Sequence, residues 1–214
     1  MTLLLALVIG AAALLEAAAV MPRVGAGDDL AAVMVAVVAR EIGPLFTAFL
    51  AAGRTGSALA TTLGNMQVRQ EIDALRAMGM DPVRFLVFPA FAATVVSLFC
   101  LMALFNATAL FGGFGAAKFL SLFASEPWLR LSFGQYLGRV ADSLGTPDAW
   151  LAVGKPACFG ALISLIACHQ GLSVGADTRA VPRAVTRSVV HSFAGIILAD
   201  AVFALAFATR REFF

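Results

Sequence analysis

The chain alternates between long apolar stretches and short polar ones, and five of the apolar stretches are long enough to cross a membrane. At about 1.5 Å per residue, roughly 20 helical residues cross a hydrocarbon core about 30 Å thick. The longest stretch, residues 85–117, contains no charged residue and gives the strongest signal. We therefore predict an all-α, polytopic membrane protein with a single domain over residues 1–214. The predicted spans lie near residues 3–22, 30–64, 85–117, 149–170 and 188–209.

The first stretch, residues 3–22, holds one charged residue, Glu16. A secretory signal peptide usually has basic residues before its apolar run, and only Met1 and Thr2 precede this one. We therefore expect a helix that is retained in the protein, broken by the turn that follows at residues 22–29.

The second stretch, residues 30–64, is too long for one perpendicular crossing. Gly43-Pro44 predicts a kink, because proline removes a backbone hydrogen bond and collides with the preceding turn. Small residues recur every four positions, and this spacing lets membrane helices approach closely. They form two rows, which pack within the subunit or at a seam between two copies: Ala52, Gly56, Ala60 and Gly64, and beside them Gly53, Ser57 and Thr61.

A short amphipathic helix is predicted at residues 67–79, between the second and third spans. Apolar residues recur there at helical spacing, charged residues occupy another face, and Gly79 suits a left-handed end before Pro82. Such a helix lies flat on the lipid surface or docks into a partner subunit and transmits force. The apolar stripe is Val68, Ile72, Leu75 and Met78, and the charged face is Arg69, Asp73 and Arg76.

Residues 118–148, between the third and fourth spans, mix polar and apolar positions. They and the start of the next span carry Trp128, Tyr136 and Trp150, and such amphipathic aromatic residues favour the membrane–water interface. We expect an interfacial helical segment there.

Composition agrees with a membrane protein. Hydrophobic residues make up 61% and charged residues 13% of the chain, whereas soluble domains are about a quarter charged. The net charge of +2 indicates no field that would attract nucleic acid. Arginine and lysine are equally numerous on the two predicted sides, so the charge rule leaves the orientation open; arginine density weakly favours loops 65–84 and 171–187 as cytoplasmic.

Three motifs occur in order along the chain: residues 40–44 (REIGP), residues 52–58 (AGRTGSA) and residues 71–82 (EIDALRAMGMDP). They resemble the signature of the MlaE/YrbE permeases, which are membrane subunits of lipid-trafficking ABC systems. The later part of the chain agrees, with Lys155, Cys168-His169-Gln170-Gly171 and Asp200. The resemblance covers the chain from about residue 8.

The resemblance implies a homodimeric permease in the bacterial inner membrane that moves phospholipid and maintains outer-membrane lipid asymmetry. It implies an ABC ATPase as a partner, an MCE-domain protein on the periplasmic side and, in many systems, a STAS-domain protein. Helix 67–79 would be a cytoplasmic coupling helix and the segment within 118–148 would be periplasmic. The expected ATPase-binding residues are Glu71, Ile72, Asp73, Leu75, Arg76, Met78 and Gly79.

Charged residues within predicted spans are costly unless they are paired or hydrated. Glu41, beside the predicted kink, is our first candidate for a polar group on the lipid pathway, although structural pairing explains it as well. We add Leu45 and Glu16 as candidate substrate-binding residues. Three further charges are candidates for structural pairing between helices: Arg54, Lys155 and Asp200.

Other functions find less support in the residues. No Walker A pattern occurs, so ATP hydrolysis would belong to another subunit. Cys168 and His169 lack the further ligands that a metal site needs, so we expect no metal and no cofactor. No catalytic constellation can be assembled, which argues against an enzyme. An ATP-independent channel or secondary transporter, or a membrane scaffold, remains the alternative.

Overall fold

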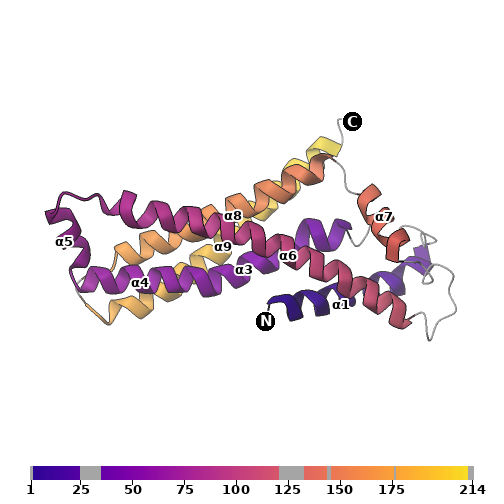
Figure 1. Cartoon of the computed structure of the whole chain (residues 1–214), viewed down its shortest axis with the longest axis horizontal. Helices are drawn as coiled ribbons and strands as arrows, with labels where there is room; N and C mark the ends of the chain where they lie inside the picture. Colours follow the sequence, from indigo (N-terminus) through magenta and orange to yellow (C-terminus); the bar gives the residue numbers. More distant parts are fainter. Residues whose placement is uncertain (1, 25–34, 121–132, 144–145, 176, 212–214) are drawn as a thin grey trace. The chain divides into compact units, whose positions relative to one another are not determined.

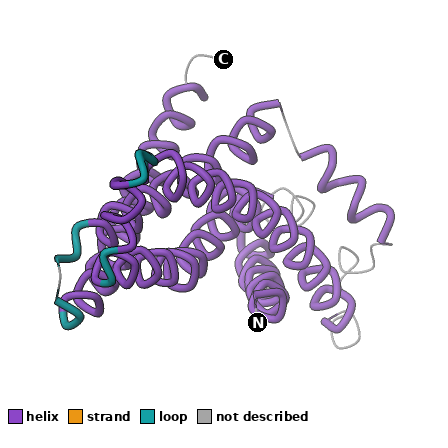
Figure 2. The backbone as a smooth tube through the Cα atoms, turned by 60° about the vertical axis from the view of Figure 1, so that its left-hand side comes forward, coloured by secondary structure: helices purple, strands orange, loops and turns teal. Residues whose placement is uncertain are grey.

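The computed structural model describes residues 2–24, 35–120, 133–143, 146–175 and 177–211, and every regular element within them is helical (Figure 2). The chain is thus an all-α protein, as predicted. Three stretches within longer helices are π-helical and carry the label η. The elements are α1 (Thr2–Val24), η2 (Val35–Ile42), α3 (Gly43–Ala51), η3 (Ala52–Gly56), α4 (Ser57–Val68), α5 (Glu71–Ala77), η4 (Val83–Val87), α6 (Phe88–Leu120), α7 (Phe133–Ser143), α8 (Thr146–Leu172) and α9 (Ala180–Arg211).

Three helical stretches in the described part are long and apolar enough to cross a membrane: Val83–Phe119, Trp150–Leu172 and Ala180–Ala206. They match the third, fourth and fifth predicted spans. Thr2–Ala13 is a shorter apolar helical stretch. The second predicted span, residues 30–64, is helical from Val35 onwards but is not among the three. The protein is therefore polytopic, and five spans remain a prediction.

Two helices extend beyond the predicted spans. Helix α1 continues through Pro22 to Val24, so the predicted turn at residues 22–29 begins later than expected, and residues 25–29 and Trp128 lie outside the described residues. Helix α9 begins at Ala180, ahead of the fifth predicted span. Pro182 is tolerated because it lies in the first turn, where its missing N–H would have no helical partner.

The chain divides into two compact units. Unit 1 comprises residues 1–47 and 100–153, in which α1 packs on η2. Its buried core contains Ala6, Val38, Phe105 and Ala109.

Helix α1 and the part of α6 in unit 1 approach closely through glycine on both sides. A Cβ on Gly10 would overlap the carbonyl of Ala109, and a Cβ on Gly112 would overlap the carbonyl of Leu7. Neither position leaves room for a side chain, so backbone packs on backbone, as small residues allow in membrane helices.

Unit 2 comprises residues 48–99 and 154–214, and α9 packs along α4 and η3. Figure 1 shows α5 turning away from the end of α4 at one end of this unit. The first predicted row of small residues is buried here, and Gly56 lies close to Ile163. Gly53, in the second row, is exposed with nothing within 4 Å of the position of a Cβ. One row therefore packs within the chain, while the other begins at an open surface.

Candidate functional site

A helix occupies the region in which a coupling helix was predicted, but it is shorter than residues 67–79. Residues 67 and 68 belong to α4, and α5 runs from Glu71 to Ala77. Gln70 separates the two helices with φ 60° and ψ 17°, in the left-handed region. The predicted apolar stripe therefore does not continue on one helix, because Val68 lies before the bend. Arg69, from the predicted charged face, lies within the bend.

The C-terminus of α5 ends as the sequence predicts. Gly79 has φ 76°, a conformation that glycine adopts without a steric penalty. Its N–H donates to the Arg76 carbonyl at 3.0 Å, and the Met80 N–H donates to the Leu75 carbonyl at 3.0 Å. These two bonds form a Schellman motif, which satisfies carbonyls that a helix end otherwise leaves without donors.

The next helix begins directly after this turn. The Asp81 carboxylate accepts a hydrogen bond from the Val83 N–H at 3.0 Å, and Pro82 occupies the start, where proline is favoured. Helix α5 thus lies between two left-handed residues, Gln70 before it and Gly79 after it. A capped helix follows.

The side chains of α5 divide into one anchor and an exposed surface. Ile72 is completely buried, Leu75 is half-buried and Met78 is 64% exposed. Of the predicted apolar stripe, Ile72 is thus buried and Val68 is half-buried like Leu75. Arg76 pairs with Asp73 at 3.0 Å, as predicted, and Arg69 approaches Glu71 at 3.9 Å.

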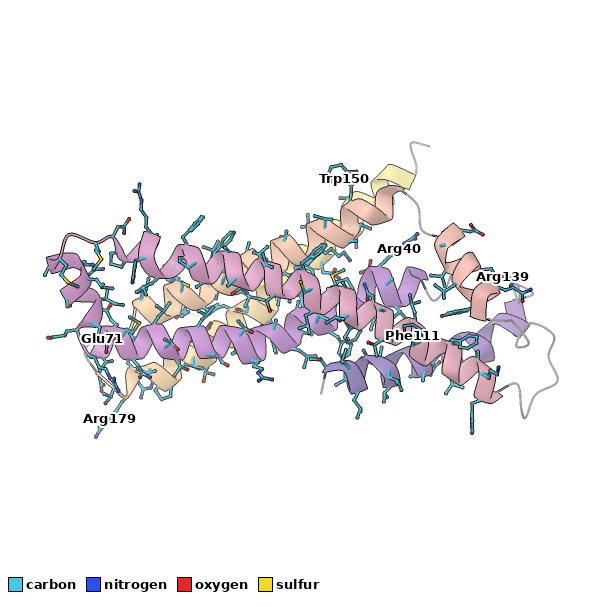
Figure 3. All side chains as sticks on the ribbon, viewed as in Figure 1. Arg40, Glu71, Phe111, Arg139, Trp150 and Arg179 are labelled. Carbon is cyan, nitrogen blue, oxygen red and sulfur yellow. The ribbon has the colours of Figure 1, made fainter. Side chains whose placement is uncertain are left out.

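The two loops predicted to share one side of the membrane meet at one end of unit 2. Val68 at the end of α4 packs against a cluster that contains Val174 and Val181. Glu71 and Arg179 lie at this same end (Figure 3). The Asp177 carboxylate accepts a hydrogen bond from the Arg179 N–H at 2.9 Å just before α9 begins. Glu71 and Arg179 thus lie on a surface outside the candidate spans.

The candidate substrate residues lie in unit 1. Glu41 is half-buried in η2, and Leu45 is half-buried one turn later in α3. Glu16 is exposed on α1. Glu41 and Leu45 thus share one helical segment, and nothing in their geometry defines a closed lipid site with Glu16.

The predicted kink region has a feature that the sequence did not reveal. A Cβ on Gly43 would overlap the Oδ1 atom of Asn106, which is buried and accepts no hydrogen bond. The hydroxyl of Thr47 donates to the Gly43 carbonyl at 2.7 Å. Glycine at position 43 therefore leaves room for α6, and π-helix η2 ends directly before it.

Two of the three predicted structural charges are paired. Lys155 Nζ lies 2.8 Å from Asp200 Oδ1, with the lysine side chain 1% and the aspartate side chain 13% exposed. The Lys155 Nζ and Asp200 Oδ1 atoms do not have the geometry of a hydrogen bond, so the contact is an ion pair without a hydrogen bond at that oxygen. Arg54 is exposed on η3. A structural role for the three charges remains a prediction.

The segment predicted to be interfacial contains an amphipathic helix, α7, at Phe133–Ser143. Tyr136 is buried, packs on Phe114 with ring centroids 5.7 Å apart, and its hydroxyl donates to the Leu110 carbonyl at 3.5 Å. Burial raises the pKa of Tyr136 to about 12. Trp150 points away from the helices (Figure 3). Within the part of the chain that the structure describes, no group of three or more metal-ligating side chains is present.

Comparison with known proteins decides the family. The family model "Permease MlaE" matches residues 1–206. The chain belongs to the MlaE permease family. This assignment agrees with the motifs quoted above, and it makes the apolar helices those of a multi-pass membrane protein of the MlaE family.

Curated MlaE-family relatives agree. A probable ABC transporter permease protein of Rickettsia bellii is 31% identical over 178 residues, which are 83% of this chain and 66% of that protein. The chloroplastic protein TRIGALACTOSYLDIACYLGLYCEROL 1 of Arabidopsis thaliana is 32% identical over 84% of this chain and 49% of its own length. A probable ABC transporter permease protein of Synechocystis is 30% identical over 82% and 64%. The chain thus spans between 49% and 66% of the length of these relatives.

Proposed function

We propose that this MlaE-family chain is the permease subunit of an ABC transporter that moves phospholipid between the inner membrane and a periplasmic MCE-domain carrier. A separate ATPase hydrolyses ATP, and two copies of the permease form the pathway. One relative's name contains a diacylglycerol lipid, which supports a lipid as the substrate. The candidate spans provide the apolar surface that acyl chains need.

The observation that carries this proposal is the construction of α5. A seven-residue helix outside the candidate spans is fixed by one buried side chain, Ile72, and by the turns at its two ends. Apart from the half-buried Leu75, its other side chains are exposed and include charged ones. Met78, directly after the helix, is exposed as well. A rigid, exposed helix of this kind suits docking into a groove of a partner and transmission of its movement.

Glu41 and Leu45 are the residues that we propose to contact lipid. Both are half-buried, Glu41 within the π-helical segment η2 and Leu45 in helix α3 directly after it, and this supports the proposal because π-helical turns are frequent at functional sites. We propose Glu16 as a more peripheral contact, since it is exposed. The exposed Gly53 supports a seam with a second copy, where a close approach of two helices needs small residues.

The test is assembly with the ATPase subunit of the same transport system, co-expressed with the chain and measured by size-exclusion chromatography. Glu71→Arg places a cation in the docking surface and should lower the yield of the complex by about tenfold, as loss of an interfacial contact does. Asp142→Arg is the matched control, because it makes the same type of change at an exposed position on α7. It should assemble like the wild type.

Transport is measured in liposomes that contain the complex and a labelled phospholipid, with a purified MCE-domain protein as the acceptor. ATP should drive transfer and a non-hydrolysable analogue should not. Lipid transfer that proceeds without the ATPase would favour an ATP-independent channel. Normal assembly of Glu71→Arg would refute the docking role of α5.

Glu41→Gln tests the lipid pathway. It should leave the complex intact and lower ATP-driven transfer, because a polar contact within the membrane is lost. Unchanged transfer would leave Glu41 as a structural residue.

A further inference from the structure

Among the residues that the structure describes, Gln70 is the only one other than glycine that has a positive φ. It lies at the bend where α4 ends and α5 begins (Figure 1). Left-handed backbone brings the Cβ of an L-residue too close to the following carbonyl oxygen, so glycine and asparagine usually occupy such positions. The bend is therefore strained where a simple rigid turn would carry glycine.

The side chain of Gln70 does not relieve this strain. It forms no capping hydrogen bond with α5, and the residue is exposed. The bend is held instead by backbone bonds on both sides. The Gln70 N–H donates to the Gln67 carbonyl at 3.0 Å, and the Ala74 N–H donates to the Gln70 carbonyl at 3.0 Å.

Beyond the bend, Ile72 provides the packing that holds α5 in place, since it is completely buried. The conformation of Gln70 thus depends on its surroundings. Relaxing it toward right-handed backbone would turn α5 toward the direction of α4 without breaking either helix. Strain of this type is a recognised basis for two-state behaviour at functional sites.

We propose that Gln70 is a positioning residue, a strained hinge that allows α5 to change its angle to α4 when the partner ATPase moves. This inference rests on the proposed function, because it assigns the movement to the surface that docks the ATPase. The hinge predicts that a residue with a low energy in the left-handed conformation stabilises the chain when it replaces Gln70. The same replacement should impair the coupling of ATP hydrolysis to lipid transfer.

Three substitutions separate backbone strain from side-chain contacts. Gln70→Gly removes the left-handed penalty, Gln70→Asn lowers it, and Gln70→Ala removes the amide while keeping the penalty. The penalty that glycine removes corresponds to a factor of about five to ten in the equilibrium between bent and relaxed states. All three variants accept the native backbone, so the chain should fold in each case.

The first measurement is thermal stability of the purified chain in detergent. Gln70→Gly should unfold at a higher temperature than the wild type, Gln70→Asn should be intermediate and Gln70→Ala should match the wild type. This result does not require the ATPase. Equal stability of all four proteins would show that Gln70 is not strained and would overturn the inference.

The second measurement is the amount of phospholipid transferred per ATP hydrolysed by the reconstituted complex. Gln70→Gly should lower this ratio by about fivefold, because relief of the strain lowers the population of the relaxed state relative to the bent state by about that factor. Assembly and ATP hydrolysis should stay within twofold of the wild type. Gln70→Asn should lower the ratio less, and Gln70→Ala should retain it.

A merely structural role would make the more stable variant at least as active, so higher stability with poorer coupling distinguishes a hinge. An unchanged ratio in Gln70→Gly, or an equal loss in Gln70→Ala, would overturn the inference while leaving the docking role of α5 intact. Failure of the wild-type chain to assemble with the ATPase would instead refute the proposed function, and the hinge with it.

Spin labels provide a direct view of the movement. Cysteines replace the exposed residues Asn65 and Ala77, on α4 and α5, in a background without Cys100, Cys158 and Cys168. The distance between the labels should change between nucleotide-free and ATP-bound complexes of the wild type and stay constant in Gln70→Gly. A constant distance in the wild type would refute the hinge.

Discussion

Lys155→Met should strongly destabilise the chain because it leaves the Asp200 carboxylate without its cation. With 2.8 Å between Nζ and Oδ1, the attraction is about 6 kcal/mol at an effective dielectric constant of about 20. Desolvation of both ions offsets part of this energy, so removal of one partner of a buried pair costs about 3–5 kcal/mol. The Asp200 side chain keeps 13% of its exposure, which places the expected loss near the lower limit, about 3 kcal/mol.

The assay is thermal unfolding in detergent, followed by fluorescence-detected size-exclusion chromatography. For a chain of this length, a loss of about 3 kcal/mol corresponds to a fall of about 6–12 °C in the unfolding midpoint. Arg183→Met also replaces a cation by methionine, at an exposed position, and should shift stability by about 0.5 kcal/mol or less.

The double variant Lys155→Met/Asp200→Leu separates the ion pair from the packing around it. An apolar pair of similar volume is often as stable as a buried ion pair, so most of the lost stability should return. If the losses of the two single variants simply added in the double variant, the two side chains would not interact and the reasoning would be wrong.

Two further predictions concern unit 1. Gly112→Ala should destabilise the chain by about 1–3 kcal/mol, because its Cβ would overlap the Leu7 carbonyl. Gly115→Ala in the same helix meets nothing within 4 Å and should be neutral or stabilising by about 0.5–1 kcal/mol. Tyr136 is the only tyrosine in the sequence, so the ultraviolet absorbance of tyrosinate should show a transition near pH 12 in the folded chain and near pH 10 after unfolding.

The pH dependence of stability follows from the raised pKa of Tyr136. Between about pH 10 and 12 the folded chain retains a proton that the unfolded chain releases, so stability is present below pH 10 and is lost as the pH rises toward 12. A transition near pH 10 in the folded chain would show that Tyr136 is not buried. Equal unfolding midpoints for Gly112→Ala and Gly115→Ala would contradict the close crossing of α1 and α6.

The sequence predicted those parts of the fold whose physical causes are local. A long uncharged run such as residues 85–117 predicts a membrane span by its own composition. Gly79 followed by Pro82 predicts a helix end through backbone preferences alone. The burial of the row that contains Gly56 also follows from its spacing. These features depend on the residues themselves and only weakly on distant partners.

The features that could not be predicted from the sequence depend on distant contacts or on backbone strain. Gln70 has no intrinsic preference for left-handed backbone, so the bend before α5 arises from burial of Ile72 and from bonds to neighbouring carbonyls. Asn106 lies next to Gly43 only because α6 passes that point. Likewise, Asp200 could not be chosen from the sequence as the partner of Lys155, because a charge within a span indicates that a partner is needed but not which residue it is.

The charges around α5 are balanced, and this affects how a partner would arrive. Glu71, Asp73 and Asp81 each lie within 4.0 Å of an arginine: Arg69, Arg76 and Arg84, respectively. The electric fields of three anions and three cations so close together cancel beyond a few ångströms, and mobile ions screen the field that remains. Encounter with a partner at this surface therefore gains little from electrostatic steering, and selectivity comes from how slowly the fitted complex dissociates.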